Sequence, residues 1–329
     1  MTDLTLPTLA DIEAAAVVVY RDFPPTPQYR WALLSERLGA DCWVKHENHT
    51  PVGAFKIRGG LALFDGLKAR GQLPREVISA TRGNHGQSIA WAARAHGVRC
   101  SIVVPRGNSA EKNVAMRALG ADLIEHGDDF TASADHARRL AADRAAQAAR
   151  PSDVLLVPSF HRDLVCGVAT YWLELLRAVP RLDVAYVPIG LGSGACAAIA
   201  AQRALGHPVR IVGVVSRHAT TYADSLAAGC VVEADATTRL ADGMAVRRAD
   251  PQALALLQGG LHHVVQVSDH EVAAAMRALY QDTHNLAEGA GAAAFAAALQ
   301  ERESLPGQQV GVALTGANVD AALMAEVLR

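Results

Sequence analysis

The sequence lacks the cysteine pattern of a disulfide framework or a zinc site. Its five cysteines are scattered along the chain, and no CxxC pair occurs among them: Cys42, Cys100, Cys166, Cys196 and Cys230. Such spacing is typical of reduced thiols in a cytosolic protein. The first residues, MTDLTLPTLADIE, contain an early acid and no apolar stretch of the kind that forms a signal peptide. We therefore expect a cytoplasmic protein.

Basic runs and long apolar runs are also missing. The formal net charge is -2 and no run of five or more basic residues occurs, so nucleic acid is not expected as the main partner. The uncharged, apolar-rich run at residues 289–300 consists mostly of Ala and Gly. It is too short and too weakly hydrophobic to cross a bilayer. These absences favour a small molecule as the partner.

What the sequence does contain is an alternation of short apolar runs with alanine-rich helical patterns. The expected strands cover residues 77–80, 101–104, 122–124, 154–157, 184–189, 210–215 and 310–314. The expected helices cover residues 87–96, 110–119, 131–149, 167–177, 194–205, 269–283 and 289–302. Buried strands in strand-helix-strand order predict an α/β fold with parallel sheets.

The length of 329 residues, half of them hydrophobic, favours two domains over one core. The stretch 75–157 holds four of the expected strands. We therefore predict a small domain at 75–157 and a large domain formed by 1–74 together with 158–329.

The loop after the strand at 184–189 has the composition of a phosphate site. Its sequence, GLGSG at 190–194, leads directly into a helix of small residues. Glycines let backbone N–H groups turn toward an anion, and a helix N-terminus adds partial positive charge. A turn that merely packs closely is the alternative. A dinucleotide site would need an acid after the next strand, and that strand ends Val214-Val215-Ser216-Arg217, so NAD is disfavoured.

Two further loops carry polar residues after a strand. In SATRGNHGQS, residues 79–88, Asn84 and His85 could bond a ligand, although Asn and Ser also simply cap helices. In TGANVD, residues 315–320, the Thr315 hydroxyl would lie at the carboxyl edge of the last strand. Ligands of open parallel sheets bind at this edge.

Lys56 stands in unusually apolar company, between Gly53-Ala54-Phe55 and Ile57, where a loop enters a helix. Burial lowers the pKa of a lysine, and only a neutral lysine is a nucleophile or a base. A buried lysine, a phosphate loop and an asparagine loop around one cleft together describe a site for pyridoxal 5'-phosphate, with Lys56 forming the Schiff base.

These motifs also carry a family resemblance. AFKIRGG, RGNHGQS, PIGLGSG, ADGMAV, AEGAGAAA and TGANVD resemble, in this order, the motifs of fold-type II pyridoxal-phosphate enzymes of the serine/threonine dehydratase and serine racemase group. The resemblance covers about residues 15–325. It implies two domains, each an open, mostly parallel sheet flanked by helices, as in the tryptophan synthase β chain. It also implies a homodimer and, since no segment follows the last motif, a catabolic enzyme.

The resemblance implies roles for the matching residues. Lys56 would hold the cofactor and, once displaced by the substrate, remove the Cα proton. The remaining cofactor contacts would be Phe55 packing on the ring, Asn84 bonding O3', Thr315 facing the ring nitrogen, Glu288 near the ring, and the backbone N–H groups of Gly190, Leu191, Gly192 and Ser193 on the phosphate. The substrate carboxylate would lie beside Thr81, Asn84 and His85.

A hydroxyl rather than an aspartate at the ring nitrogen favours β-elimination over reprotonation. The expected reaction is loss of water from L-threonine or L-serine, which yields a 2-oxo acid and ammonia. The open alternatives are phenylserine or 3-hydroxyaspartate as substrate, because Arg82 and the stretch Ser159-Phe160-His161 are atypical. A β-replacement enzyme of the cysteine synthase type and a non-catalytic binding protein are further alternatives.

Three departures from the family pattern matter. Arg82 occupies the position of the serine that serine racemases use as their second acid/base, so racemisation is not expected. Arg82 could instead bind an acidic side chain of the substrate, or it could point to solvent or to an acid of the protein. Leu191 interrupts the glycines of the phosphate loop and must adopt an allowed φ or be strained. Val215 and Ser216 stand where cation-activated members carry a glutamate, so no metal site is expected, apart from a shifted one at Asp224.

Overall fold

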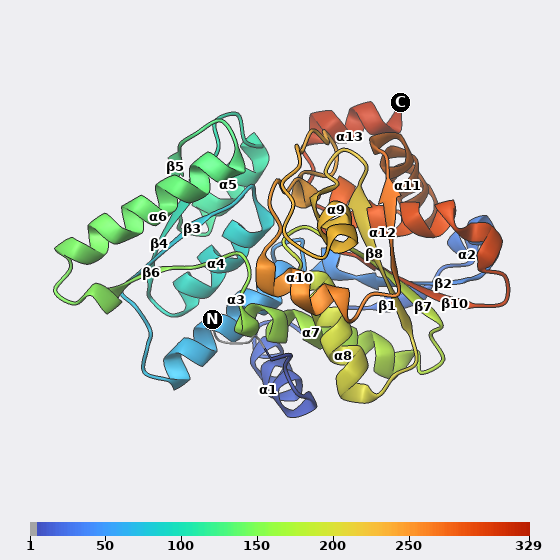
Figure 1. Cartoon of the computed structure of the whole chain (residues 1–329), viewed down its shortest axis with the longest axis horizontal. Coiled ribbons are helices and arrows are strands. Elements are labelled where there is room, and N and C mark those ends of the chain that lie inside the picture. The colour runs from blue at the N-terminus through green and yellow to red at the C-terminus, as the bar shows by residue number, and fades with distance from the viewer. Residues whose placement is uncertain (1–4) are drawn as a thin grey trace.

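The computed structural model describes residues 5–329 and contains two sheets (Figure 1). The larger sheet has the order β1-β2-β10-β7-β8-β9, and only the β1–β2 pair is antiparallel. Its strands are β1 (Gln28–Arg30), β2 (Asp41–His46), β7 (Val184–Pro188), β8 (Arg210–Ser216), β9 (His263–Val267) and β10 (Gln309–Leu314). The α/β fold with parallel sheets predicted from the sequence is thereby confirmed.

The smaller sheet is wholly parallel and has the order β5-β4-β3-β6. Its strands are β3 (Glu76–Ala80), β4 (Arg99–Val104), β5 (Asp122–Glu125) and β6 (Val154–Leu156). These are the four strands that the sequence assigns to the stretch 75–157. The separate sheet supports a division into two lobes, and the domain boundaries themselves stay a prediction.

Helices cover both faces of each sheet (Figure 1). One face of the larger sheet packs on α2 (Ala32–Leu38), α11 (Asp269–Thr283), α12 (Gly289–Gln300) and α13 (Ala321–Leu328), and the other on α1 (Leu9–Val19), α7 (Arg162–Ala178), α8 (Ser193–Leu205) and α10 (Pro251–Gln258). α9 (Thr221–Ala228) precedes α10. The smaller sheet lies between α6 (Phe130–Gln147) on one face and α4 (Asn84–Ala95) and α5 (Ala110–Ala118) on the other. None of the helices within residues 5–329 is both long and apolar enough to cross a membrane.

All seven expected strands and all seven expected helices are present, with some ends displaced. The largest displacement is in α7, which begins at Arg162 instead of residue 167, because the side chain of His161 caps it by accepting from the Asp163 N–H. The strand expected at 184–189 ends at Pro188, and the helix expected at 87–96 begins at Asn84. Sequence reasoning missed β1, β2 and β9. In β2 the fully buried Lys45 interrupts the apolar pattern.

Helix α3 (Lys56–Ala69) lies between the lobes and contacts both α4 and α7. Its approach to these helices depends on residues without a side chain. A Cβ at Gly60 would lie 2.8 Å from the carbonyl oxygen of Ser88 in α4, and a Cβ at Gly167 in α7 would collide with the carbonyl oxygen of Arg58. Backbone therefore lies against backbone on two sides of α3.

A buried ion cluster anchors the first turn of α3. The Arg58 guanidinium donates to Glu47 at 2.7 Å and to Glu174 at 2.6 Å, and Lys45 Nζ lies 2.5 Å from Glu174. The side chains of Arg58, Glu47 and Lys45 are fully buried. Removing one member of such a cluster leaves an uncompensated buried charge and is strongly destabilising. The cluster ties α3 to β2 and α7.

Gly167→Ala tests the close packing of α3. The added methyl group must displace the backbone of α3, so the free energy of unfolding should fall by about 1–3 kcal/mol in urea denaturation. Gly259→Ala is the matched control, since its Cβ would meet only an Arg203 side-chain atom, 3.7 Å away. Equal stability of Gly167→Ala and the parent protein would contradict the packing described.

Candidate active site

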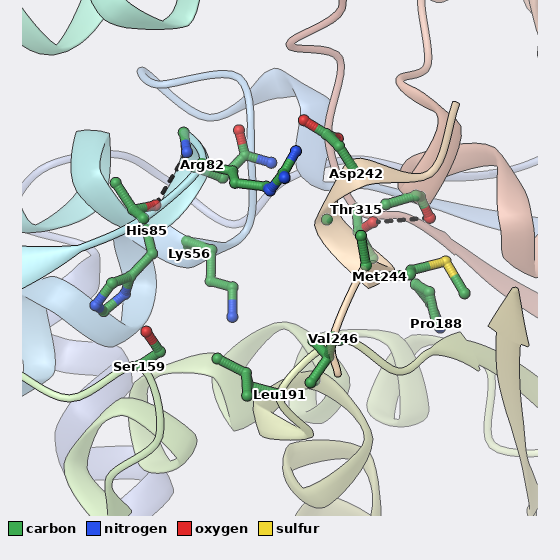
Figure 2. Close-up of a pocket in the computed structure, with 18 of the residues that line it drawn as sticks. Lys56, Arg82, His85, Ser159, Pro188, Leu191, Asp242, Met244, Val246 and Thr315 are labelled. Atoms are coloured by element: carbon green, nitrogen blue, oxygen red, sulfur yellow. Dashed lines mark hydrogen bonds between the residues drawn. The ribbon is translucent and has the colours of Figure 1, made fainter. Parts of the chain in front are cut away.

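A cleft between the lobes lies at the carboxyl ends of β3, β7 and β10 (Figure 2). This is the edge at which open parallel sheets bind ligands. Every residue to which the sequence assigns a site role lines this one cleft: Phe55, Lys56, Thr81, Arg82, Asn84, His85, Gly190, Leu191, Gly192, Ser193, Glu288 and Thr315. Of the atypical stretch 159–161, Ser159 lines the cleft, Phe160 packs in the core and His161 caps α7.

Lys56 is the first residue of α3 and reaches into the cleft (Figure 2). Its Nζ donates to Ser193 Oγ at 2.8 Å and lies 4.9 Å from the centroid of the Phe55 ring. Burial lowers the pKa of Lys56 to about 8. At pH 7 about a tenth of the amine is then neutral, far more than for a lysine in water.

The chain has only four lysines, and the other three are placed differently. Lys45 is paired with Glu174, and Lys112 with Asp242 at 2.6 Å. Lys68 is exposed near the end of α3. Within residues 5–329, Lys56 is therefore the one buried or half-buried lysine without a carboxylate partner. An amine in this state is suited to covalent chemistry.

The loop 190–194 has the shape of an anion cradle. Gly192 has φ 96° and Ser193 begins α8, whose first N–H groups have no side-chain cap. A Cβ at Gly190 would collide with the carbonyl oxygen of Gly243. Among the described residues His284 is the only non-glycine with positive φ, so Leu191 is not strained. These features fit the phosphate of pyridoxal phosphate.

The asparagine loop is held by its own hydrogen bonds. Thr81 Oγ accepts from the N–H groups of Gly83 at 3.0 Å and Gly86 at 3.3 Å. Asn84 Nδ2 donates to Glu288 Oε1 at 2.6 Å, and Asn84 Oδ1 accepts from Asn318 Nδ2 at 2.8 Å. An amide nitrogen carries two hydrogens, so Asn84 keeps one for a ligand.

Two neutral groups face the cleft near these loops. His85 is buried with its Nε2 unpaired, and burial lowers the pKa of His85 to about 3. Thr315 is buried at the end of β10, and its hydroxyl makes one long hydrogen bond, to the Ala290 carbonyl at 3.5 Å. The Thr315 hydroxyl is thus available to a ring nitrogen, and the residue at this position is a threonine and not an aspartate.

Sequence reasoning missed Lys112, which reaches the cleft from α5. Its ammonium lies 2.6 Å from Asp242 and 3.5 Å from Glu288, both in the larger lobe. Although burial opposes it, the two carboxylates raise the pKa of Lys112, while burial raises the pKa of Glu288. A lone lysine within an amphipathic helix gives no local signal of such a pairing.

No metal-binding cluster is found in residues 5–329, where no three His, Cys, Asp or Glu side chains are placed to hold an ion. Asp224, the position considered for a shifted site, accepts a hydrogen bond from the Thr220 hydroxyl at 2.6 Å.

Comparison with known proteins places the site in context. Residues 19–316 match the family described as pyridoxal-phosphate dependent enzyme. The L-threo-3-hydroxyaspartate ammonia-lyase of Saccharomyces cerevisiae is 30% identical over 96% of this chain and 95% of its own length. The L-threonine ammonia-lyase of Geobacter sulfurreducens is 36% identical over 87% of this chain and 69% of its own length.

The biosynthetic L-threonine dehydratase of Pasteurella multocida is 31% identical over 92% of this chain, and the match spans only 58% of that relative's length. Among solved structures, threonine deaminase isoform 2 of Solanum lycopersicum superposes with a TM-score of 0.85 at 26% identity, covering 98% of this chain and 94% of that one. Maize serine racemase superposes with a TM-score of 0.88 at 24% identity, covering 98% and 97%, and shows the shared fold.

Lys56→Met tests the desolvation of the amine. With a pKa of about 8 when folded and about 10.4 when unfolded, Lys56 binds fewer protons in the folded state, so its presence destabilises the cofactor-free protein most at low pH. Lys56→Met should therefore be more stable than the parent protein at pH 7. The difference should shrink by up to about 1.4 kcal/mol per pH unit between about pH 8 and 10. Denaturant unfolding at several pH values measures it, and a pH-independent difference would contradict the buried amine.

Proposed function

The chain belongs to the family of pyridoxal-phosphate-dependent enzymes, and from this premise we propose that it removes water from a β-hydroxy amino acid. The observation that carries the proposal is the solitary, half-buried Lys56 facing a phosphate cradle, the amide of Asn84 and the hydroxyl of Thr315 across one cleft. The names of the relatives, threonine and hydroxyaspartate ammonia-lyases, support the same reaction class.

The residues of the cleft would contact the phosphate, the ring, the O3' oxygen and the aldehyde carbon of the cofactor. The N–H groups of the loop 190–193 would bind the phosphate, Phe55 would pack on the ring, and the second hydrogen of Asn84 Nδ2 would bond O3'. Lys56 would bind the aldehyde carbon covalently, and Glu288 would lie near the ring. When bound, pyridoxal phosphate supplies an electron sink that stabilises the negative charge developing at Cα.

Lys56 would then act as the base. Once the amino group of the substrate has displaced it, its amine is free in a site that disfavours the ammonium form, as its pKa of about 8 shows. Ser193 Oγ, 2.8 Å from Nζ, orients the amine. General bases of this kind are most effective when their pKa lies near the working pH.

Thr315 would influence whether β-elimination or return of the proton to Cα follows proton removal. A carboxylate in its place would hold a proton on the ring nitrogen, whereas the Thr315 hydroxyl does not. Negative charge at Cα is then held less strongly, and loss of the β-hydroxyl competes better with return of the proton. We therefore propose β-elimination and not racemisation.

The reaction balances without an oxidant or a reductant. The Cα–H and Cβ–O bonds break and a Cα=Cβ bond forms, so one water leaves. The enamine that is released takes up one water and gives a 2-oxo acid and ammonia. L-threonine and L-serine are the proposed substrates, because their β-substituents are the smallest among the β-hydroxy amino acids considered.

The proposal includes the cellular location and the oligomeric state of the enzyme. The scattered thiols support a cytoplasmic location, and the family resemblance supports a homodimer. β-Replacement would require a second nucleophile in the cleft and is distinguished by its product.

Lys56→Ala tests the proposed catalysis. Without the amine, release of ammonia and 2-oxo acid from L-threonine and L-serine should fall by at least about a thousandfold, because both covalent binding and the base are lost. Lys68→Ala, on the exposed end of the same helix, should retain full activity. A parent holoenzyme that releases no ammonia from any β-hydroxy amino acid would overturn the proposal.

A chelator tests the predicted lack of a metal site. Because Val215 and Ser216 stand where cation-activated members carry a glutamate, we expect activity to be unchanged after dialysis against a chelator. Activity that collapses under chelation and returns with Mg²⁺ would show that prediction to be wrong.

A further inference from the structure

Arg82 is a cation in the cleft without an acid partner among the described residues. It lies in the turn between β3 and α4, is half-buried, and its Nε is buried without a hydrogen-bond partner. Within residues 5–329 no carboxylate lies within ion-pair distance of its guanidinium, whereas Lys112 in the same cleft has two. Burying an unpaired charged donor costs free energy, and an anionic ligand would recover it.

The position of Arg82 argues against the cofactor phosphate as this anion. Figure 2 shows Arg82 extending toward Asp242, whereas Leu191 of the phosphate loop lies on the other side of Lys56. The phosphate loop already has its own donors, the N–H groups at the start of α8. Asp242, toward which Arg82 extends, is engaged by Lys112 at 2.6 Å.

The α-carboxylate of the substrate also has donors of its own. α4 begins at Asn84 without a side-chain cap on its N-cap residue. Thr81 Oγ accepts from the Gly86 N–H, which leaves the N–H groups of Asn84 and His85 and the partial positive charge of the helix start available. Arg82 stands two residues before Asn84 and adds a full positive charge beside these donors. A guanidinium binds a carboxylate through two parallel hydrogen bonds, which a single point charge cannot match.

We propose that Arg82 is a specificity-determining residue that binds a second carboxylate, carried on the β-carbon of the substrate. The site then takes an acidic β-hydroxy amino acid, such as L-threo-3-hydroxyaspartate, ahead of L-threonine or L-serine. The inference rests on the proposed β-elimination and narrows its substrate class. A neutral, bulky β-substituent such as the phenyl group of phenylserine would leave the guanidinium unpaired.

Steady-state kinetics on the holoenzyme test the assignment. The parent enzyme should have a higher kcat/KM for L-threo-3-hydroxyaspartate than for L-threonine. In Arg82→Gln the ratio of the two values should fall by about tenfold or more, since the loss of one charge-assisted pair is of that size. Arg82→Lys keeps the charge but loses the two parallel hydrogen bonds of the guanidinium, so its ratio should lie between those of the parent enzyme and Arg82→Gln. Arg94→Gln removes an exposed charge from α4, the helix that follows Arg82, and should leave the ratio unchanged.

Binding of unreactive analogues gives a second readout. L-aspartate and L-alanine lack a β-hydroxyl, and calorimetry should show that the parent holoenzyme binds L-aspartate more tightly, a preference that Arg82→Gln removes. Equal losses for both substrates and both analogues would place Arg82 at the α-carboxylate and overturn the inference. A preference of the parent enzyme for L-threonine or phenylserine would overturn it too. Failure of every β-hydroxy amino acid to react would instead refute the proposed elimination, while the analogues still report on Arg82.

Discussion

To have a lowered pKa, the amine of Lys56 has to be kept out of water and away from carboxylates, although it lies in the cleft between the two sheets. Helix α3 meets this requirement because Gly60 and Gly167 let it lie directly against α4 and α7. The nearby acids beneath it, Glu47 and Glu174, are bound by Arg58 and Lys45. The ion cluster therefore has two effects. It anchors the first turn of α3, and it neutralises Glu47 and Glu174 so that neither pairs with Lys56.

The same separation of charge continues across the cleft. Lys112 of the smaller lobe binds Asp242 and Glu288 of the larger lobe, and Asn84 donates to Glu288. The acids of the cleft are thus engaged, and Lys56 and Arg82 remain as cations without an acid partner among residues 5–329. A cleft of this character favours anionic ligands, as a phosphorylated cofactor and an amino-acid carboxylate both are. The contacts of Lys112 also join the two lobes across the cleft.

Much of this arrangement could be predicted from the sequence, because it depends on local patterns. Glycines after a buried strand predict the phosphate loop, and apolar neighbours predict a buried Lys56. The rest depends on contacts between distant segments. Lys45 interrupts the apolar pattern of β2, and its partner Glu174 lies far along the chain, so the strand could not be recognised from the local sequence. Lys112 likewise has no neighbour in the sequence that indicates its pairing with Asp242. The sequence indicates that a helix begins near Lys56, but it does not explain why that helix contains Gly59 and Gly60, which have low helix propensity. Their close contacts with α7 and α4 supply the reason.

The proposed chemistry depends on which lysine carries the cofactor. Borohydride reduction of the holoenzyme, followed by proteolysis and mass spectrometry, fixes the pyridoxyl group to the lysine that binds it. Because the chain has four lysines and three of them are ion-paired or on the surface, the account predicts the label on the peptide that contains Lys56 and on no other. A label on Lys45, Lys68 or Lys112, or a holoenzyme that retains no label after reduction, would contradict it.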